Sequence, residues 1–426
     1  MTPVPFRLVR FWSWAVVAGC LAIAATTGTA RADQGKAPLK IGFSMSLTGP
    51  LAGNGKAALL AIQIWAEDQN ARGGLLGRPV KLVYYDDQTN PSTVPGIYNK
   101  LLDVDKVDLI VSGYGTNVIA PAIPIAMQRT MCFITLFGTN PNGKFKYKRY
   151  FQIMPNGPEP AVGLTEGFFD LAMTMNPRPK TVALLGADAE YPHAALEGAR
   201  TVIKRHGLQI VYDKTYPQTT TDYTPVLRAV QAASPDLVFV ASYPPDSAGL
   251  VRAANEINLK VKMFGGPMIG LQFAALKTQL GPLLNGITAW ELYVPEKSID
   301  WPFLQDFLKK YQPRAVAEKL DPLGFYLPPY AYAMMQVLSD AVQKVGSLDQ
   351  DKIAQTIHAG EWKTVVGTVR FAPNGEWAQS RALYVQYRGI KGNDLEEWKQ
   401  PGRAPVLWPA TFQTGKLVYP YDQARK

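Results

Sequence analysis

In this sequence, short apolar segments alternate with amphipathic segments whose apolar residues recur at helical spacing, and this alternation occurs twice. In the first half, predicted strands at 40–47, 80–85, 108–112 and 132–136 alternate with predicted helices at 57–70, 93–104 and 118–128. After a loop at 140–148, strands at 181–185, 209–212, 237–241 and 262–264 alternate with helices at 194–205, 225–233 and 247–257. Strands separated by single helices indicate βαβ units with right-handed crossovers and a parallel sheet. We therefore predict an α/β fold with two Rossmann-like, doubly wound lobes in tandem.

The C-terminal part does not follow this alternation of strands and helices. Two longer helices are predicted at 302–311 and 330–344. Pro373-Asn374-Gly375 lies between apolar segments at 365–371 and 381–387, and an Asn-Gly pair so flanked is a strong short-range hairpin signal. We expect these two segments to form a β-hairpin.

The first 32 residues have the three parts of an export signal. Met1–Arg10 is basic, Phe11–Ala25 is apolar, and Ala30-Arg31-Ala32 matches a small-residue cleavage site. Removing 32 of the 426 residues leaves 394, a length typical of two domains, and the loss of three arginines lowers the net charge from +10 to +7. We expect a soluble, exported, periplasmic protein.

An alternative is that Val17-Ala18-Gly19-Cys20 is a lipobox, so that a lipidated Cys20 holds the protein on a membrane. The apolar run continues past Cys20, which favours the soluble form. No later segment has the roughly 18 apolar residues that a membrane span requires. If residues 1–32 are removed, only Cys132 is left, and no intramolecular disulfide can form.

Basic residues are scattered except in the segment Lys144–Arg149, where they alternate with aromatic side chains. This pattern suits either a nucleic-acid patch or a solvated loop, and export favours the loop. We expect no nucleic-acid partner.

The loops that follow the predicted strands indicate a ligand cleft, since parallel sheets bind ligands at the carboxyl ends of their strands. In the first lobe these loops carry small hydroxyl and amide groups, which suit a carboxylate near a helix N-terminus: Thr48, Asn54, Thr116, Asn117 and Thr139. In the second lobe they carry Tyr191, Tyr243 and Met268, which suit an apolar body. Each residue alone is explained as a turn or a cap, but together they favour a cleft.

The sequence offers little support for catalysis. Its three histidines, His193, His206 and His358, lack metal-ligand spacing, and no G-x-S-x-G motif occurs. The glycines of Gly49–Lys56 do not fit a phosphate loop, and the adjacent Asp86 and Asp87 would point to opposite faces of a strand, so a strand-end cap is favoured for them. We expect no catalytic residue, no metal and no cofactor.

Several motifs resemble those of a known family in order and spacing: Ile41-Gly42-Phe43-Ser44, Leu47-Thr48-Gly49-Pro50, the segment Asn70–Pro79, Tyr85-Asp86-Asp87 and Thr139-Asn140-Pro141. They are similar to those of the periplasmic branched-chain amino acid (Leu/Ile/Val)-binding proteins, the type I solute-binding proteins of ABC transporters. The resemblance implies two lobes, joined by three chain crossings, that close on a ligand by hinge motion. The expected boundaries are a signal peptide at 1–32, a first lobe at 39–152 plus about 293–364, and a second lobe at 153–292 plus about 365–426.

The resemblance also implies site residues. Hydroxyl and backbone N–H groups that hold a ligand carboxylate match Tyr114, Gly115 and Thr116 after one strand and Phe137, Gly138 and Thr139 after the next. The two second-lobe tyrosines of the family match Tyr191 and Tyr243, its aromatic wall residue becomes Asn54, and its disulfide positions become Thr89 and Gly115. The family's acid, which pairs with the ligand's α-ammonium, becomes Met268.

Because a buried ammonium without an anionic partner is disfavoured, Met268 favours a ligand without an α-amino group, such as an aromatic or short aliphatic acid. A branched-chain amino acid is the alternative, with Asp188, Glu190 or Asp246 as the substituting acid. We expect a monomeric, non-enzymatic receptor that captures a small carboxylate or amino acid for an ABC permease. A ligand sensor exported on the same fold is a second alternative.

Overall fold

The computed structural model describes residues 36–299 and 301–426. The predicted export signal and Cys20 lie outside the described residues. From Ala37 onward the chain contains two main β-sheets, one of five strands and one of seven, each with helices packed against it. We call the five-stranded sheet with its helices the first lobe, and the seven-stranded sheet with its helices the second lobe.

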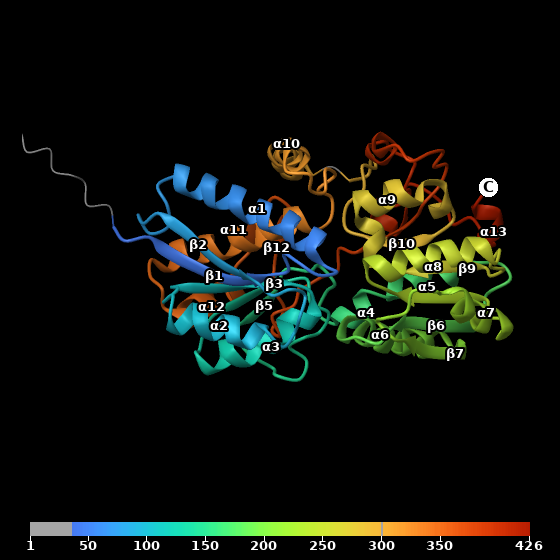
Figure 1. Ribbon diagram of the computed structural model, residues 1–426, viewed down its shortest axis with the longest axis horizontal. Helices are drawn as coiled ribbons and strands as arrows, with labels where there is room; N and C mark the ends of the chain where they lie inside the picture. The colour runs from blue at the N-terminus through green and yellow to red at the C-terminus, as the bar shows by residue number, and fades with distance from the viewer. Residues whose placement is uncertain (1–35, 300) are drawn as a thin grey trace, which may run out of the picture. The chain divides into compact units, whose positions relative to one another are not determined.

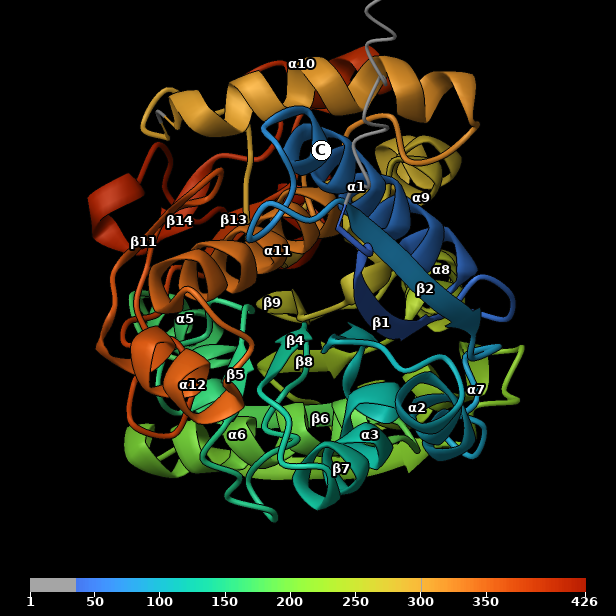
Figure 2. The same cartoon turned by 90° about the vertical axis from the view of Figure 1, so that its left-hand side faces the viewer.

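The first lobe has a parallel sheet with strand order β2-β1-β3-β4-β5. Its strands are β1 (Leu39–Met45), β2 (Val80–Asp86), β3 (Leu109–Tyr114), β4 (Phe133–Leu136) and β5 (Tyr150–Gln152). Its helices are α1 (Ala52–Ala71), α2 (Val94–Asp103), α3 (Thr116–Gln128), α10 (Pro302–Ala317), α11 (Leu327–Val345) and α12 (Gln350–Ala359). Although α11 comes from the C-terminal part of the chain, it packs beside α1 (orange and blue in Figure 1), and α10 packs against both (Figure 2). The central strand β1 contacts α1 and α2 and is almost wholly buried, as in sheets covered on both faces.

The second lobe has a mixed sheet with strand order β14-β13-β10-β9-β8-β6-β7. Its parallel strands are β6 (Thr181–Ala187), β7 (Gln209–Tyr216), β8 (Leu237–Ala241), β9 (Met263–Gly266) and β10 (Thr288–Glu291), and its antiparallel strands are β13 (Leu383–Gln386) and β14 (Val406–Trp408). Its helices are α4 (Pro160–Gly163), α5 (Glu166–Ala172), α6 (Glu190–His206), α7 (Thr224–Ala232), α8 (Pro244–Glu256), α9 (Ala274–Leu280) and α13 (Tyr421–Ala424). Short 3₁₀ helices lie at η1 (Ile269–Gln272), η2 (Gly281–Leu284), η3 (Leu395–Lys399) and η4 (Ala410–Phe412).

The chain passes between the two lobes three times. It leaves the first sheet after β5, returns after β10 to form α10, α11 and α12, and crosses again before β13. The predicted fold, with two doubly wound α/β lobes joined by three crossings, is confirmed. The residue limits of the lobes given above stay a prediction.

The predicted C-terminal hairpin is wrong. The segment at 365–371 contains β12 (Gly367–Val369), which pairs with β11 (Trp362–Thr364), whereas β13 pairs with β10 and β14 of the second sheet. A single bridge, Phe371 to Trp377, closes the turn at Pro373-Asn374-Gly375. The Asn-Gly signal thus identified a turn, but its two flanking segments separate because the chain crosses between the lobes at this point.

Helix α1 begins at Ala52, before the predicted start at residue 57, and includes Gly53, Asn54 and Gly55. Glycine is a poor helix former, which is why periodicity alone placed the start later. At Gly55 an added Cβ would lie 2.0 Å from the carbonyl oxygen of Ser46. A glycine is therefore required for α1 to pack this closely against the end of β1.

One ion pair is buried inside the second lobe. Lys277 Nζ lies 2.7 Å from Glu291 Oε1, and both side chains are less than one-twentieth exposed. Tyr387 donates a 2.5 Å hydrogen bond to the same carboxylate oxygen, and the Trp398 ring lies 4.6 Å from the ammonium. These contacts compensate both charges, as burial of an ion pair requires.

Candidate functional site

Thr116 and Thr139 come together where β3 and β4 end. Gly115, with φ of 99°, precedes α3, and a positive φ is a conformation that glycine tolerates. This turn lets Thr116 begin the helix with its hydroxyl oxygen accepting a 2.9 Å hydrogen bond from the backbone N–H of Thr139. The Thr139 hydroxyl is buried and has no protein partner among the described residues. A buried hydroxyl without a partner is a candidate ligand contact.

A cavity of about 970 Å³ opens beside this pair of threonines. Its first-lobe wall includes Thr116, Asn117, Thr139 and Asn140, and its second-lobe wall comes from the start of α6, with Ala189, Glu190 and His193. The first backbone N–H groups of α3 have no intrahelical acceptor, so this end of the helix favours an anion. We call this space the larger cavity.

Tyr243 connects the two lobes. Its hydroxyl donates a 2.8 Å hydrogen bond to Asn117 Oδ1 in the first lobe. Its ring packs against that of Tyr191, with ring centres 5.4 Å apart, and the Tyr191 hydroxyl donates to the carbonyl oxygen of Pro267. The structure therefore brings together both tyrosines that the sequence singled out.

A second cavity, of about 170 Å³, lies on another side of Asn117. It is lined from the first lobe by Pro50, Leu51, Thr89 and Asn117, and from the second lobe by residues that include Tyr216, Tyr223, Tyr243 and Asp246. Tyr216 donates a 2.5 Å hydrogen bond to Asp246 Oδ2. Burial raises the pKa of the Asp246 carboxyl to about 6, although the hydrogen bond from Tyr216 opposes this effect. We call this space the smaller cavity.

Other predicted residues form an aromatic group that lines neither of these cavities. Tyr114 and Tyr326 place their hydroxyl oxygens 3.1 Å apart, and Phe137 packs its ring on Tyr326. Asn54 is buried close to Tyr114, and its side-chain nitrogen has no protein partner among the described residues. Burial raises the pKa of both tyrosine hydroxyls far above the usual range, so both are neutral donors.

Gly138 and Met268 are also held within the protein. The carbonyl oxygen of Gly138 accepts a 3.0 Å hydrogen bond from Gln152, and an added Cβ would lie 2.8 Å from Pro141. Met268 is fully buried at the end of β9 and lines neither the larger nor the smaller cavity. The ligand contacts assigned to these residues stay predictions.

The acids named as alternatives to Met268 lie in different surroundings. Asp188 is exposed and lies 2.7 Å from His193, whereas Glu190 is exposed at the rim of the larger cavity. Asp246 alone of the three is buried. The structure thus separates Asp246 from the other two candidates.

Sequence analysis missed Tyr216, Tyr223 and Tyr326. The strand predicted at 209–212 extends to Tyr216 in the structure, because β7 is an edge strand and tolerates the polar segment Asp213–Thr215. Parallel sheets bind ligands at the carboxyl ends of their strands, so a strand predicted to end at Tyr216 would have identified this residue as a candidate. Tyr326 lies directly before α11, in the loop that follows α10, and has no local signal.

Asp86 and Asp87 act as strand-end caps, as predicted. Asp86 accepts hydrogen bonds from the backbone N–H groups of Leu47 and Thr48 and from the Thr48 hydroxyl, and Asp87 accepts one from Ser46. These bonds hold the loop that leads into α1. Thr89, at a position of the family's disulfide, donates from its hydroxyl to the carbonyl oxygen of Thr48 in the same loop.

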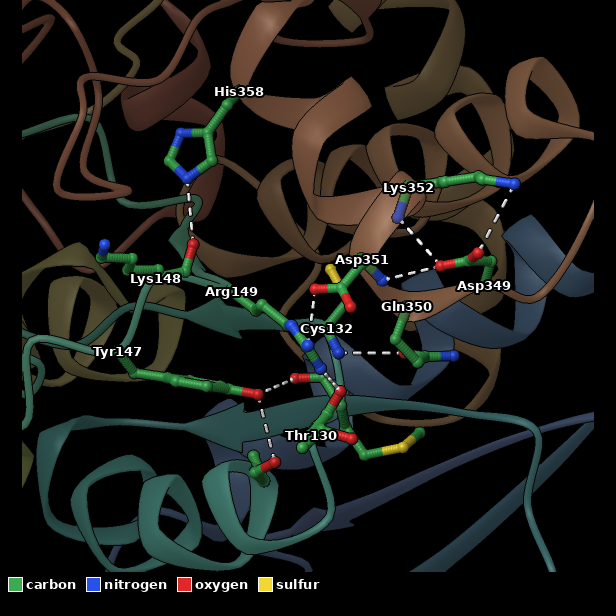
Figure 3. Close-up of polar contacts among 12 residues, drawn as sticks. Thr130, Cys132, Tyr147, Lys148, Arg149, Asp349, Gln350, Asp351, Lys352 and His358 are labelled. Carbon is green, nitrogen blue, oxygen red and sulfur yellow. Dashed lines mark hydrogen bonds and ion pairs between the residues drawn. The ribbon is translucent and has the colours of Figure 1, made fainter.

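The basic and aromatic segment 144–149 is a solvated loop, as predicted. Its lysines are exposed, while Tyr147 donates a 2.6 Å hydrogen bond to the carbonyl oxygen of Met131 and Arg149 pairs with Asp351 at 2.5 Å (Figure 3). Cys132, directly before β4, is a free buried thiol, and burial raises its pKa to about 12. Its backbone N–H donates to Gln350 of α12, which ties the strand to that helix.

No helix in residues 36–299 and 301–426 is long and apolar enough to cross a membrane. The same part of the chain holds no group of three or more His, Cys, Asp or Glu side chains placed to bind a metal ion.

Two α/β lobes with cavities between them have the architecture expected of a solute-binding protein. The model of the periplasmic binding protein family matches residues 38–392, and the chain belongs to this family. It is 23% identical over 371 residues to the leucine-, isoleucine-, valine-, threonine- and alanine-binding protein of Pseudomonas aeruginosa, covering 87% of this chain and 93% of that protein. It is 22% identical to the Leu/Ile/Val-binding protein of Escherichia coli, covering 85% of this chain and 93% of the relative. The predicted resemblance to the branched-chain amino acid-binding proteins is confirmed.

Solved structures agree on the fold. A leucine-binding protein from Thermotoga maritima superimposes with a TM-score of 0.72 at 20% identity, covering 84% of this chain and 96% of that structure. A solute-binding protein of an ABC transporter from R. palustris, in complex with benzoate, gives a TM-score of 0.70 at 18% identity, covering 87% and 95% of the two chains. The same fold therefore occurs in a protein named for leucine binding and in a protein solved in complex with benzoate, and both compounds carry a carboxylate.

Proposed function

We propose that the chain is the periplasmic substrate-binding component of an ABC importer, which captures a small carboxylated solute between its lobes and delivers it to an inner-membrane permease. The basic, apolar and small-residue parts of Met1–Ala32 support export. Family membership and relatives with the same two-lobed fold support the transport role. The chain acts by binding and closure, without chemistry of its own.

The observation that carries the carboxylate assignment is the unpartnered Thr139 hydroxyl at the N-terminus of α3. A carboxylate placed in the larger cavity would accept hydrogen bonds from this hydroxyl and from the free N–H groups of the first turn of α3. Such charge-assisted bonds are stronger than neutral ones, and the helix end favours negative charge.

The relatives support the same chemical class. Leucine, isoleucine, valine, threonine and alanine, named for the Pseudomonas aeruginosa protein, share a carboxylate with the benzoate bound by the R. palustris protein. A carboxylate is the one charged group common to all of these compounds. A branched-chain amino acid is the second candidate, favoured by the buried acid Asp246 at the edge of the smaller cavity.

A thermal-shift screen tests the proposal. Benzoate, 4-methylpentanoate and leucine are compared with benzamide, which has the shape of benzoate but no charge. A ligand at 100 times its Kd stabilises the protein by roughly 2.7 kcal/mol. We expect at least one acid to raise the melting temperature and benzamide to have no effect. Equal shifts with benzamide, or no shift with any carboxylate, would refute the assignment.

A further inference from the structure

The smaller cavity contains a buried acid without a cationic partner. Asp246 is only 6% exposed, and its carboxylate borders the cavity. No lysine, arginine or histidine lines the cavity, and within the described part of the chain no ion pair includes Asp246. Among the described residues, the one side chain that donates to its carboxylate is the neutral Tyr216.

This arrangement is costly for a purely structural acid. Removing a carboxylate from water is strongly unfavourable unless a charge partner compensates for it. The N-terminus of α8, where Asp246 lies in the first turn, offsets part of this cost. The helix end explains why the acid is tolerated, but it does not supply the missing cation.

The walls of the cavity suit an organic cation. The rings of Tyr216 and Tyr223 pack edge to face, with centres 5.3 Å apart, and Tyr243 closes another side. Tyrosine faces attract alkylammonium groups, and Leu51 from the first lobe offers apolar contact to a short carbon chain. A volume of about 170 Å³ is sufficient for an alkylammonium group and a short carbon chain.

Asn117 links this cavity with the proposed carboxylate site. It lines both cavities, and its side chain accepts the hydrogen bond from Tyr243 that joins the lobes. A solute held by Thr139 in the larger cavity would pass this contact to reach Asp246. A solute that uses both sites must therefore carry two charged groups some distance apart.

We infer that Asp246 forms a second ligand subsite, which binds the protonated amine of a carboxylate-bearing solute whose two charges lie on different sides of Asn117. This inference rests on the proposed function, because the carboxylate is assigned to the larger cavity. It also agrees with Met268, since an amine distant from the carboxylate does not need an acid at that position. The solute class is an amino acid with a terminal rather than an α-amino group.

The test compares matched solutes by calorimetry. The probes are hexanoate, 6-aminohexanoate, leucine and butylamine, measured with the wild-type protein, with Asp246→Asn and with Asp188→Asn. Asp188 is an acid of a neighbouring strand-end loop, but it is exposed and borders neither cavity. We expect 6-aminohexanoate to bind about 10- to 150-fold more tightly than hexanoate in wild type and in Asp188→Asn, which is the range of a charge-assisted contact.

In Asp246→Asn this advantage should disappear while hexanoate affinity is kept. The inference is wrong if the amine gives no advantage in wild type, a comparison that depends on no variant, or if the advantage persists in Asp246→Asn. Leucine binding more tightly than 6-aminohexanoate would overturn the separation of the charges. If hexanoate fails to bind while butylamine binds only with Asp246 present, the proposed carboxylate function fails and the amine subsite stands.

Discussion

Replacing Thr139 by valine should have opposite effects on stability and on binding. Thr139 is 2% exposed, its backbone N–H donates to Thr116, and its hydroxyl has no protein partner among the described residues. Valine has nearly the same shape and keeps the backbone hydrogen bond. The substitution therefore removes a buried polar atom at little cost in packing.

The expected magnitudes follow from this environment. An unsatisfied buried hydroxyl costs about 1–3 kcal/mol, so the ligand-free variant should be more stable by up to this amount, a rise in melting temperature of roughly 1–3 °C. If Thr139 donates to a ligand carboxylate, its loss should weaken binding by about 1.5–3 kcal/mol, or about 10- to 150-fold. Urea unfolding measures the first effect, and calorimetry with the tightest carboxylate of the screen measures the second.

Thr135→Val, on β4 just before the loop that carries Thr139, is the matched control. The Thr135 hydroxyl is buried but donates a 3.0 Å hydrogen bond to the carbonyl oxygen of Phe151, so this change should lower stability and leave affinity unchanged. If Thr139→Val is destabilised as Thr135→Val is, the Thr139 hydroxyl has a structural partner after all. If its affinity is unaltered, Thr139 does not contact the ligand and the carboxylate site lies elsewhere.

Three further predictions concern charge and the thiol. Because burial raises the pKa of the Asp246 carboxyl to about 6, the folded protein binds this proton more tightly than the unfolded chain does. The unfolding free energy of the ligand-free protein should therefore fall as pH rises from about 4 through 6. Asp246→Asn should remove up to about 3 kcal/mol of this fall, measured by urea unfolding between pH 4 and 8. Lys277→Met should lower the unfolding free energy by about 3–5 kcal/mol, since it leaves the carboxylate of Glu291 buried without its cation, whereas Lys309→Met at an exposed pair should have little effect. Cys132 should react with a thiol reagent only in denaturant, and a reductant should leave the melting temperature unchanged; a reagent that labels Cys132 in the native protein would contradict its burial.

Local patterns predicted the lobes well because their strands are central and apolar. β8 is buried along its whole length and appears in the sequence as a continuous apolar segment, and β1 and β9 are buried at almost every position. β7 was predicted too short because an edge strand has one open side and accepts polar residues there. Strands buried on both faces could therefore be predicted from the sequence, whereas the full length of the edge strand could not.

The candidate site was predictable to the extent that it follows from sheet topology. Thr116 and Thr139 were expected to meet because neighbouring parallel strands end at the same edge, and they do. The smaller cavity was not predictable, because its walls come from both lobes and depend on how Leu51 and Asn117 face Tyr223. The periodicity of a single segment does not predict which residues of two distant segments come into contact.

The pairing of β10 with β13 has a consequence for the order in which the protein can be completed. The second sheet runs from β6 to β10 within one stretch of chain, but the outer side of β10 is covered only by β13, which follows α10, α11 and α12. Until that late segment arrives, β10 presents unpaired backbone groups that invite pairing with another chain. A protein shortened before Leu383 should therefore aggregate, and neither lobe can be produced as a single uninterrupted segment. A circular permutant that begins in the linker before β6 would leave β10 and β13 equally far apart in the sequence, because α10, α11 and α12 would still lie between them.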